Sequence, residues 1–454
     1  MEPSLHIGAG SGWLNDPNGP IWWKDRWHVF FQHNPHEPQH GCIHWAHVSS
    51  ADLRSWRREP IALRPRPGAP DAAGCWSGCV TSDDGVPAAV YTGVADNDDP
   101  GTVCIAHGDD GLTTWTQPET PVATVPPGVT EMRDPFVFHH EGGRWAVVGA
   151  RLDDGRAAAL LFSCDDLRRW EPRGTLATST DPVAADLPEA DIWECPQLAR
   201  VDGRWVLILS LWRARVLTGV AYLVGDVVAE HVDGLHFAAD AGGLVDAGRD
   251  YYAPAVLSDS TSDRGLLWGW SWEARSDEAV TESGWAGVLT LPRELRLSGD
   301  LLLSSPAPES EALRGPRSVH GARLEPGAAL DLPGSTAEVL ISVPAGFDGG
   351  VQLIDPLGTE LLEIHLSGTG ALGSLHWSGA VAEIAKAHRS GRPDEIVTVR
   401  FLVDRTVVEA FCSHHTSATA RTAASEDGTW RLRSRPSGSV TDLPRADAWT
   451  LEAR

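Results

Sequence analysis

RWVLILS (204–210) is a short apolar run of the kind that forms a buried β-strand, and the chain repeats its pattern. Four similar runs occur elsewhere: RWHVFF from Arg26, PAAVYTG from Pro87, RWAVVGA from Arg144 and GLLWGWS from Gly265. In chain order, the five runs begin 61, 57, 60 and 61 residues apart. A period of this length indicates that one supersecondary unit is repeated along the chain.

A second pattern runs in step with the first. Roughly half a repeat after each of the first four runs comes a turn-forming sequence that ends in an aromatic residue: DLRSW (52–56), DGLTTW (110–115), DLRRW (166–170) and DGLHF (233–237). These sequences predict a tight hairpin at the outer edge of each unit.

The five units predict an all-β fold, because short apolar runs separated by Gly, Asp and Pro replace any long helical periodicity. A five-bladed β-propeller with four strands in each blade would close radially and leave no long exposed strand edge. The alternative, a β-solenoid, usually has a much shorter period. We therefore expect a propeller with long connecting loops.

After Leu297 the pattern changes, and a second all-β domain is expected. Residues 303–318 are rich in Ser, Pro and Glu, as linkers are. Alternating apolar segments follow: AEVLISV (337–343), LLEIHL (361–366) and TVRFLVDRTVVEAF (398–411), the last as two strands about an Asp404–Arg405 turn. The predicted division is a propeller over 1–305, a linker over 306–318 and a β-sandwich over 319–454.

The composition argues against several classes of partner. With a net charge of −25, the chain of 454 residues offers no basic patch for nucleic acid, anionic membranes or phosphorylated substrates. It has no apolar stretch of 18 residues that would predict a transmembrane helix. Twenty Trp against four Tyr suits stacking on sugar rings, although large core residues of a β-fold would give the same count. A small molecule or an oligosaccharide is the expected partner.

The N-terminal sequence MEPSLHIGAGSGW lacks the basic and apolar regions of a signal peptide. Seven cysteines show neither CxxC pairs nor zinc-like spacing with histidine, which indicates free thiols in a reducing compartment. We expect a cytoplasmic protein that uses no cofactor and no metal.

The sequence GWLNDPNGP (12–20) combines two turn-forming dipeptides, Asp-Pro and Asn-Gly, and on its own predicts a hairpin loop. The repeat indicates that this turn sequence has more than a structural role. Four polar residues each stand ten positions before a strand run: Asp16, Ser77, Asp134 and Glu194. Equal positions in different blades place side chains at one end of the channel. Three carboxylates brought together there would be costly without a chemical purpose.

Paired carboxylates without a cluster of metal-binding histidines are the equipment of glycoside hydrolysis. One acid must be ionised to attack, and another must be protonated to donate to the leaving oxygen. Asp16 lies among amide donors, including the Asn15 side chain, which favour a carboxylate and suit a nucleophile. Glu194 has less polar neighbours, which should raise its pKa and suit an acid/base.

Asp134 follows Arg133, whose guanidinium could keep Asp134 ionised or could itself bind substrate hydroxyls. An ionised Asp134 that holds sugar hydroxyls would stabilise a positively charged transition state. An ordinary hairpin ion pair is the alternative for these two residues. A calcium site would also use three acids, but calcium prefers oxygens clustered in one loop, whereas these lie far apart in the sequence.

These residues belong to motifs that resemble one enzyme family along nearly the whole chain. The motifs are WLNDPNG (13–19), WSG (76–78), RDP (133–135), ECP (194–196), DYYA (250–253), GWAGVLTLPREL (284–295) and FLVDRTVVEAF (401–411). In this order the set is similar to glycoside hydrolase family 32, the β-fructofuranosidases. The resemblance implies a five-bladed propeller with a C-terminal β-sandwich and retaining cleavage of terminal β-fructofuranosides. It also implies Asp16 as nucleophile, Glu194 as acid/base and Asp134 as transition-state stabiliser.

The resemblance further implies a fructose subsite lined by Asn15, Gln32, Trp76, Ser77 and Arg133, with Tyr252 nearby. Some of these residues have ordinary structural alternatives. Gln32 could cap a loop and Trp76 could be a core residue, and the residues around Tyr252 depart from the common pattern. Trp270 could contact a ligand or pack on an inner strand.

Two departures from the family pattern concern specificity. His40 stands where the family commonly has Trp, so one aromatic wall of the pocket is expected to be missing or replaced. Gln197 stands after ECP, where sucrose-cleaving members often carry an acid, and we expect it on the leaving-group side. Loss of a carboxylate there weakens the expectation of sucrose and leaves short fructans as possible substrates.

The sequence thus predicts a retaining exo-β-fructofuranosidase acting on sucrose or short fructans. A fructosyltransferase or a fructan-preferring exo-hydrolase would have the same active site. An inverting five-bladed hydrolase of arabinosides or xylosides and a non-catalytic sugar-binding propeller are the remaining alternatives, although binding alone does not require three intact acids.

Overall fold

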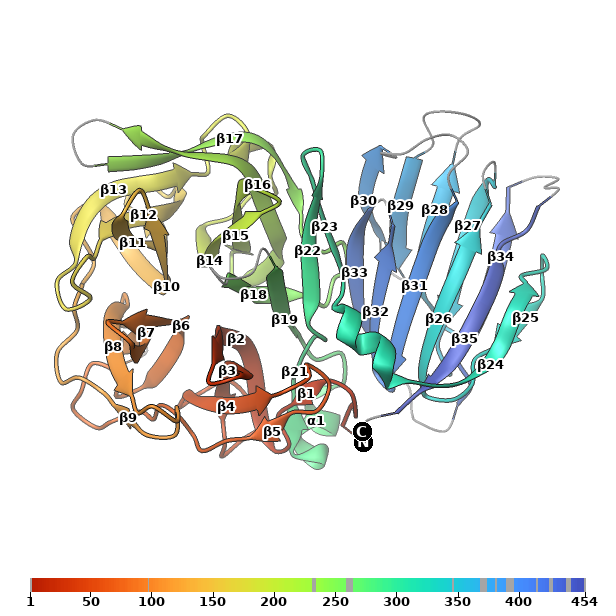
Figure 1. Ribbon diagram of the computed structural model, residues 1–454, viewed down its shortest axis with the longest axis horizontal. Coiled ribbons are helices and arrows are strands. Elements are labelled where there is room, and N and C mark those ends of the chain that lie inside the picture. Colours follow the sequence, from red (N-terminus) through yellow and green to blue (C-terminus); the bar gives the residue numbers. More distant parts are fainter. Residues whose placement is uncertain are drawn as a thin grey trace.

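The computed structural model describes residues 2–96, 98–230, 234–258, 264–344, 347–367, 374–379, 382–388, 396–413, 415–423, 428–437 and 442–452. In these ranges the helices are α1 (Asp277–Ser283) and the 3-10 helices η1 (Ala184–Asp186) and η2 (Pro308–Leu313). None of them has the length and apolar character needed to cross a bilayer. Strands make up the rest of the regular structure and form a five-bladed propeller followed by a β-sandwich (Figure 1).

The first four blades are antiparallel sheets in which strands follow one another from the axis outward. The first has β2 (Gly12–Trp23), β3 (Arg26–Asn34), β4 (His44–Ser50) and β5 (Arg57–Arg58); the second has β6 (Gly74–Asp83), β7 (Val86–Val94), β8 (Thr102–Gly108) and β9 (Trp115–Thr116). The third has β10 (Val129–His140), β11 (Gly143–Leu152), β12 (Ala157–Ser163) and β13 (Glu171–Thr178); the fourth has β14 (Ile192–Val201), β15 (Arg204–Arg213), β16 (Val216–Glu230) and β17 (Gly234–Leu244).

The fifth blade also takes in the N-terminus. Its strands are β18 (Tyr252–Ser258), β19 (Gly265–Ser271), β21 (Val288–Leu289), β22 (Arg293–Ser298) and β23 (Leu301–Pro306), joined at the edge of β21 by β1 (Ile7–Gly8). In addition, β20 (Trp285–Ala286) pairs in parallel with β2 in the first blade. The two ends of the propeller chain are thus interleaved, which closes the ring.

The predicted repeat is confirmed by the position of the five apolar runs. Each is the second strand of a blade: β3, β7, β11, β15 and β19. The strands before them, β2, β6, β10, β14 and β18, contact one another in a closed ring around the axis (Figure 1). Three of the predicted outer hairpin sequences lie between the third and fourth strands of their blades. The fourth, DGLHF, begins outside the described residues.

Every innermost strand has a bulge at the level of the predicted site residues. The pairing register shifts between Leu14 and Pro17 in β2 and between Cys75 and Gly78 in β6. Equivalent shifts occur in β10, β14 and β18. At each shift, two residues oppose one on the next strand, which re-aims side chains toward the axis. GWLNDPNGP is therefore part of a bulged strand and not the hairpin loop that its turn-forming residues predict.

The register also corrects the predicted equivalence of the three acids. Glu194 is the last paired residue before the shift in β14, as Arg133 is in β10 and Tyr252 is in β18. The first unpaired residue is Asp134 in β10 and Cys195 in β14. In β2 the last paired residue is Leu14, and Asp16 is the second unpaired one. Counting ten residues back from the strand runs therefore brings the three acids to the same bulge level but not to equivalent positions, since they are the last paired, first unpaired and second unpaired residues of their strands.

The β-sandwich consists of two six-stranded sheets over a common apolar core. One sheet has the order β24 (Arg314–Arg323), β35 (Arg445–Leu451), β26 (Thr336–Val343), β31 (Val397–Asp404), β32 (Val407–Cys412) and β33 (His415–Arg421). The other has β25 (Ala329–Asp331), β34 (Arg431–Pro436), β27 (Gly349–Ile354), β28 (Glu360–Ser367), β29 (Ser374–Gly379) and β30 (Ala382–His388).

The segment 306–318 differs from the predicted linker. Helix η2 lies within it, and β24 begins at Arg314 and pairs with β35. Arg314 donates to the buried carboxylate of Glu338 at 2.8 Å, and its guanidinium carbon lies 4.5 Å from the ring centroid of Trp449. These contacts give the Ser- and Pro-rich segment a fixed place in the sandwich sheet.

The propeller and the sandwich meet through fully buried charges. Arg293 in β22 donates to Glu409 of the sandwich and to Asp246 of the propeller, both at 2.7 Å. The ring of His6 bridges Asp404 at 2.9 Å and Glu409 at 3.0 Å. These side chains are completely or almost completely shielded from solvent. We call these five residues the junction cluster.

Candidate active site

A cavity of about 280 Å³ lies at one end of the propeller axis. All five blades contribute to its wall, which consists of Trp13, Asn15, Asp16, Gln32, His40, Trp76, Arg133, Asp134, Glu194, Trp212, Leu217, Tyr252 and Trp270. Eight of the nine predicted site residues are among them. The ninth, Ser77, is almost fully buried and lies against Asp16.

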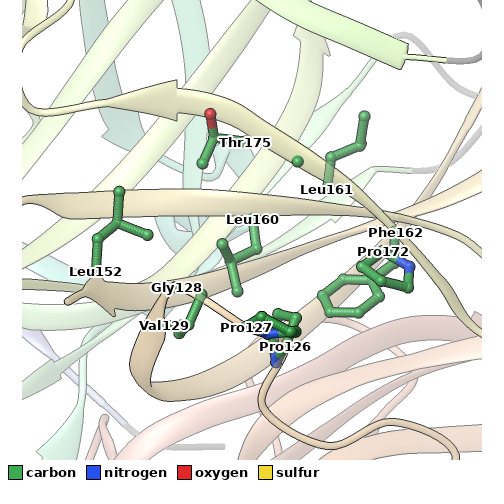
Figure 2. A pocket seen from close by; sticks show the side chains of 11 residues that line it. Pro126, Pro127, Gly128, Val129, Leu152, Leu160, Leu161, Phe162, Pro172 and Thr175 are labelled. Carbon is green, nitrogen blue, oxygen red and sulfur yellow. The ribbon is translucent and has the colours of Figure 1, made fainter.

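A second cavity, of about 260 Å³, lies on the third blade (Figure 2). The 11 residues that line it include no ionisable side chain, and Leu160, Phe162 and Pro126 are typical of them. Of these two cavities, the axial one is therefore the one with side chains for acid–base chemistry.

Asp16 is held by side chains from three blades. Its Oδ2 accepts hydrogen bonds from the hydroxyl of Ser77 at 2.6 Å and from the Gln32 amide at 3.1 Å. Its Oδ1 accepts one from the Asn15 amide at 3.1 Å, and the Cys195 thiol lies 3.6 Å from Oδ2. So many donors fix the direction in which the carboxylate faces the cavity.

Asp134 lies deeper, with 5% of its surface exposed, and its backbone has a φ of 63°. This left-handed conformation is uncommon outside glycine but is tolerated by Asp, and the bulge in β10 requires it here. The backbone N–H of Cys195 donates to Asp134 Oδ2 at 2.9 Å, and the N–H of Asp134 donates to Thr92 at 2.7 Å. Neighbouring blades therefore hold Asp134 from both sides.

Glu194 lines the same cavity as Asp16 and Asp134, and their negative charges act on it. Arg133 Nη1 donates to its Oε1 at 3.2 Å, and the Tyr252 hydroxyl donates to its Oε2 at 2.7 Å. The guanidinium carbon of Arg133 lies 5.3 Å from the ring centroids of both Trp76 and Trp212. A cation clamped between two indoles in this way loses little freedom when it binds a second partner.

Comparison with known proteins identifies the family of the chain. Residues 6–306 match the family model described as "Glycosyl hydrolases family 32 N-terminal domain". The chain belongs to glycoside hydrolase family 32. It is therefore a glycoside hydrolase, as the motifs at the three acids predict.

Curated relatives extend the similarity beyond the propeller. The chain is 31% identical over 433 residues to sucrose-6-phosphate hydrolase of Bacillus subtilis, covering 90% of this chain and 86% of that protein. It is 32% identical over 432 residues to raffinose invertase of Escherichia coli, with the same shares covered.

Solved structures of the family share the fold. Fructan 1-exohydrolase IIa of Cichorium intybus superposes with a TM-score of 0.83 at 23% identity, covering 100% of this chain and 97% of that one. For a β-fructofuranosidase of Bombyx mori the TM-score is 0.81 at 24% identity, covering 100% and 94%.

In this family 32 enzyme, burial dominates the electrostatics of the site. Burial and the charge of Asp134 raise the pKa of Asp16 to about 7, although its hydrogen-bond donors act in the opposite direction. Burial also raises the pKa of Glu194 to about 7, against the effect of Arg133. Burial raises the pKa of Asp134 as well, opposed by Arg133 and by the Cys195 N–H. The donors predicted around Asp16 are present, but burial outweighs them.

The family 32 site includes aromatic residues that the sequence did not single out. Trp13 donates from Nε1 to Asn15 at 3.1 Å, and its ring meets that of Trp270 at 5.7 Å. Trp212 follows directly on the apolar run of the fourth blade, where its spacing carried no signal. His40 lies edge-on to Trp76 at 5.8 Å, so a histidine takes the place of the expected aromatic wall.

The prediction for Gln197 is wrong, because this side chain does not line the cavity. It is 5% exposed and accepts the backbone N–H of Val256 at 3.0 Å, which joins β14 to β18. The bulge at Cys195 and Pro196 inserts an extra residue, and the side chain after it is turned between the blades. Gln197 therefore gives no information about the leaving group.

Proposed function

We propose that this enzyme is a retaining, exo-acting β-fructofuranosidase that hydrolyses terminal non-reducing β-D-fructofuranosides of sucrose or short fructans. The observation that carries the proposal is the meeting of three carboxyl groups, from three different blades, in one cavity at the propeller axis. Sugar-binding alone would not require such a group of acids, whereas double displacement requires a nucleophile and an acid/base.

In the proposed first step, Asp16 attacks the anomeric carbon of the fructosyl unit, and Glu194 protonates the departing glycosidic oxygen. The carbon–oxygen bond to the leaving sugar breaks as the bond to Asp16 forms. Water, deprotonated by Glu194, then attacks the same carbon, releases fructose and restores both acids.

The surroundings of the two acids support these roles. The three acids interact, so ionisation of one disfavours ionisation of the others. Four donors surround Asp16 and favour it as the ionised member, whereas Glu194 has only Arg133 and Tyr252. A pKa of about 7 for Glu194 suits a group that both gives and takes a proton near neutral pH.

The remaining predicted residues have complementary roles in the proposal. Asp134 binds fructose hydroxyls and stabilises the positive charge that develops in the transition state. Asn15 and Gln32 orient Asp16 and contact the sugar at the same edge of the cavity. Trp76 provides an apolar wall, and Ser77 acts from behind Asp16.

An unphosphorylated sugar is the proposed substrate. Among the cavity-lining residues, Arg133 is the permanent cation, and it is already bonded to Glu194 and Glu131. The net charge of −25 adds long-range repulsion of anions. The name of the Bacillus subtilis relative refers to a phosphorylated sugar, so phosphorylated and unphosphorylated sucrose should be compared directly as substrates.

Product analysis after incubation with sucrose, 1-kestose, inulin, levan and sucrose 6-phosphate tests the proposal. We expect free fructose as the product of chain-end cleavage and at least tenfold higher kcat/KM for sucrose than for its 6-phosphate. With methanol as an added acceptor, retention gives the methyl β-fructofuranoside. The methyl α-fructofuranoside would exclude double displacement, and oligosaccharides longer than the substrate would indicate a fructosyltransferase.

A further inference from the structure

The sandwich contacts the propeller segment 246–250, which leads directly into β18 and the active site. The N–H of Ala247 donates to the carbonyl of Ser417 at 2.7 Å, and Asp246 accepts the N–H of Thr419 at 2.8 Å. Gly248 passes so close that a Cβ there would lie 1.9 Å from the carbonyl oxygen of Thr419. Strand β33 therefore fixes the backbone that immediately precedes Tyr252.

Asp250 joins the sandwich to an aromatic residue of the fifth blade. One oxygen, Oδ2, accepts the backbone N–H of Arg421 in β33 at 2.7 Å. The other, Oδ1, accepts the indole N–H of Trp272 at 2.7 Å. Asp250 is 4% exposed, so both bonds are shielded from water.

Arg421 holds the same strand end through its side chain. Its guanidinium donates to the carbonyl oxygens of Ser271 at 3.2 Å and Trp272 at 3.3 Å, and it pairs with Glu273 at 3.3 Å. Arg421 is fully buried. A sandwich residue thus fixes both the backbone of Trp272 and, through Asp250, its ring.

Trp272 in turn packs on the residue that touches the acid/base. Its ring is stacked on that of Tyr252, with an interplanar angle of 14° and a centroid distance of 6.5 Å. The Tyr252 hydroxyl donates to Glu194 at 2.7 Å. The contacts therefore run without interruption from the sandwich to a side chain of the reaction centre: Arg421, Asp250, Trp272, Tyr252 and Glu194.

We propose that Asp250, Trp272 and Arg421 are positioning residues for Glu194: they hold the Tyr252 ring in place, so that the sandwich takes part in the reaction through the propeller. The inference rests on the proposed function, in which Glu194 is the acid/base. It differs from a purely stabilising role of the sandwich, because it requires that loosening these contacts changes the proton transfer itself.

The direction of the effect follows from the hydrogen bond to Glu194. Tyr252 donates to Glu194 and so opposes the rise in the pKa of Glu194 that burial causes. Loosening Tyr252 should therefore move the basic limb of the kcat/KM profile to higher pH. Loss of the Asp250 charge alone would move that limb to lower pH, since a nearby negative charge raises the pKa of a carboxyl group.

Two conservative variants test the proposal. Trp272→Phe keeps an aromatic ring but removes the N–H that Asp250 accepts. Asp250→Asn keeps the shape but leaves one acceptor oxygen for the three donors Arg421 N–H, Trp272 Nε1 and Arg249 Nε. Each is expected to lower kcat about tenfold with little change in KM, because a small displacement of a catalytic group has a large effect on rate.

A matched control is available in Arg400→Met. Arg400 also forms an ion pair in the sandwich, with Glu338 at 2.7 Å, but contacts no residue of the proposed series in the described part of the chain. The Arg400→Met variant should lower thermal stability without shifting the pH profile of kcat/KM.

A double-mutant cycle with Tyr252→Phe separates positioning from general damage. If Trp272 acts through Tyr252, Trp272→Phe should have little further effect on kcat once the tyrosine hydroxyl is gone. Additive losses in the cycle, or an unchanged kcat and pH profile in both single variants, would overturn the proposal.

Hydrogen exchange tests the positioning contacts separately from the proposed function. If the wild-type enzyme releases no sugar from any tested substrate, the proposed function fails. The exchange rate of peptides covering residues 246–256 then shows whether the sandwich contacts hold the segment around Tyr252 in place. Faster exchange in Asp250→Asn and Arg421→Met than in Arg400→Met supports it. Equal exchange in all three overturns it.

Discussion

The axial cavity and the junction cluster each contain three acids, but their charges are balanced very differently. In the cavity, Asp16, Asp134 and Glu194 face Arg133, whose other guanidinium nitrogen is bonded to Glu131. Burial raises the pKa of each of the three acids. The cavity therefore keeps protons that ordinary carboxyl groups would lose.

The junction cluster combines its acids with two buried cations. Burial acts to raise the pKa of Glu409, but Arg293 and His6 outweigh it and hold that pKa below the usual range. The pKa of Asp404 is also lowered: burial is outweighed by the bonds from His6 and from nearby backbone N–H groups. Burial would lower the pKa of His6, yet Asp404 and Glu409 raise it to about 9.

Burial is thus common to both regions, and the supply of cations decides its result. Where each acid is bonded to a cation, burial yields a fixed set of ion pairs that joins two domains. Where this is not so, it yields groups that exchange protons near neutral pH, as acid–base chemistry requires. Removing an acid should consequently have opposite effects on stability in the two regions.

Asp16→Asn is expected to show the largest effect. It should lower kcat on sucrose by on the order of 10⁴-fold, because the proposed nucleophile is lost while the cavity keeps its shape. Steady-state kinetics with a folded, purified variant checks this. Wild-type activity would exclude Asp16 as the nucleophile.

The same variant should be more stable than the wild type. A carboxyl group whose pKa is raised from 3.8 to about 7 favours folding when protonated and opposes it when ionised. Asparagine removes that cost, so the free energy of unfolding should rise by about 2 kcal/mol at pH 8 and show no such gain at pH 4. Denaturant unfolding at both pH values measures it, and an equal gain at both would point to another cause.

Glu409→Gln is expected to give the second largest effect, in the opposite direction. The amide would replace the carboxylate that bonds both Arg293 and His6, leaving these cations to Asp246 and Asp404, and breaking this buried pairing should cost about 3–5 kcal/mol of stability. Activity measured well below the lowered unfolding temperature should stay within a few-fold of wild type. Asp110→Asn, which breaks an exposed pair with Lys24, serves as the control and should change stability by less than about 1 kcal/mol.

His6→Gln should give the smallest effect and the most pH-dependent one. Because the pKa of His6 is raised from 6.5 to about 9, its charge stabilises the fold fully below pH 6.5 and loses that effect as the pH rises through 9. The variant should therefore be about 2 kcal/mol less stable at pH 6 and closer to wild type at pH 9.5. A difference that does not depend on pH would show that His6 is neutral in the junction.

The sequence predicts the architecture well because a propeller repeats its signal. The run at Arg204 and its four counterparts are all second strands, and the apolar segments after residue 319 lie in the sandwich sheets. The local conformation of single segments is predicted less well where tertiary contacts override the preference of the residues. GWLNDPNGP has turn-forming residues, yet pairing with β3 on one side draws it into a strand with two register shifts.

The site is predictable to the extent that its residues belong to motifs. Asp16, Asp134 and Glu194 could be brought together from the repeat alone. Trp212 and Leu217 could not, because they reach the cavity from a hairpin whose path depends on packing. Gln197 was misplaced since a bulge reverses the direction of every later side chain. The Asp250 contacts depend on a neighbouring domain, which no local pattern reveals.

The N-terminal segment has a consequence for how the protein forms. Strand β1 completes the fifth blade, and the residues just before it are fixed by Asp404: Ser4 and Leu5 donate their backbone N–H groups to its carboxylate at 3.0 and 2.7 Å. These partners are 400 and 399 residues apart in the sequence. On the ribosome, Ser4 and Leu5 cannot make these bonds until Asp404 has been synthesised. A chain stopped before residue 404 can therefore pair β1 with β21 but lacks the carboxylate that fixes the residues just before β1.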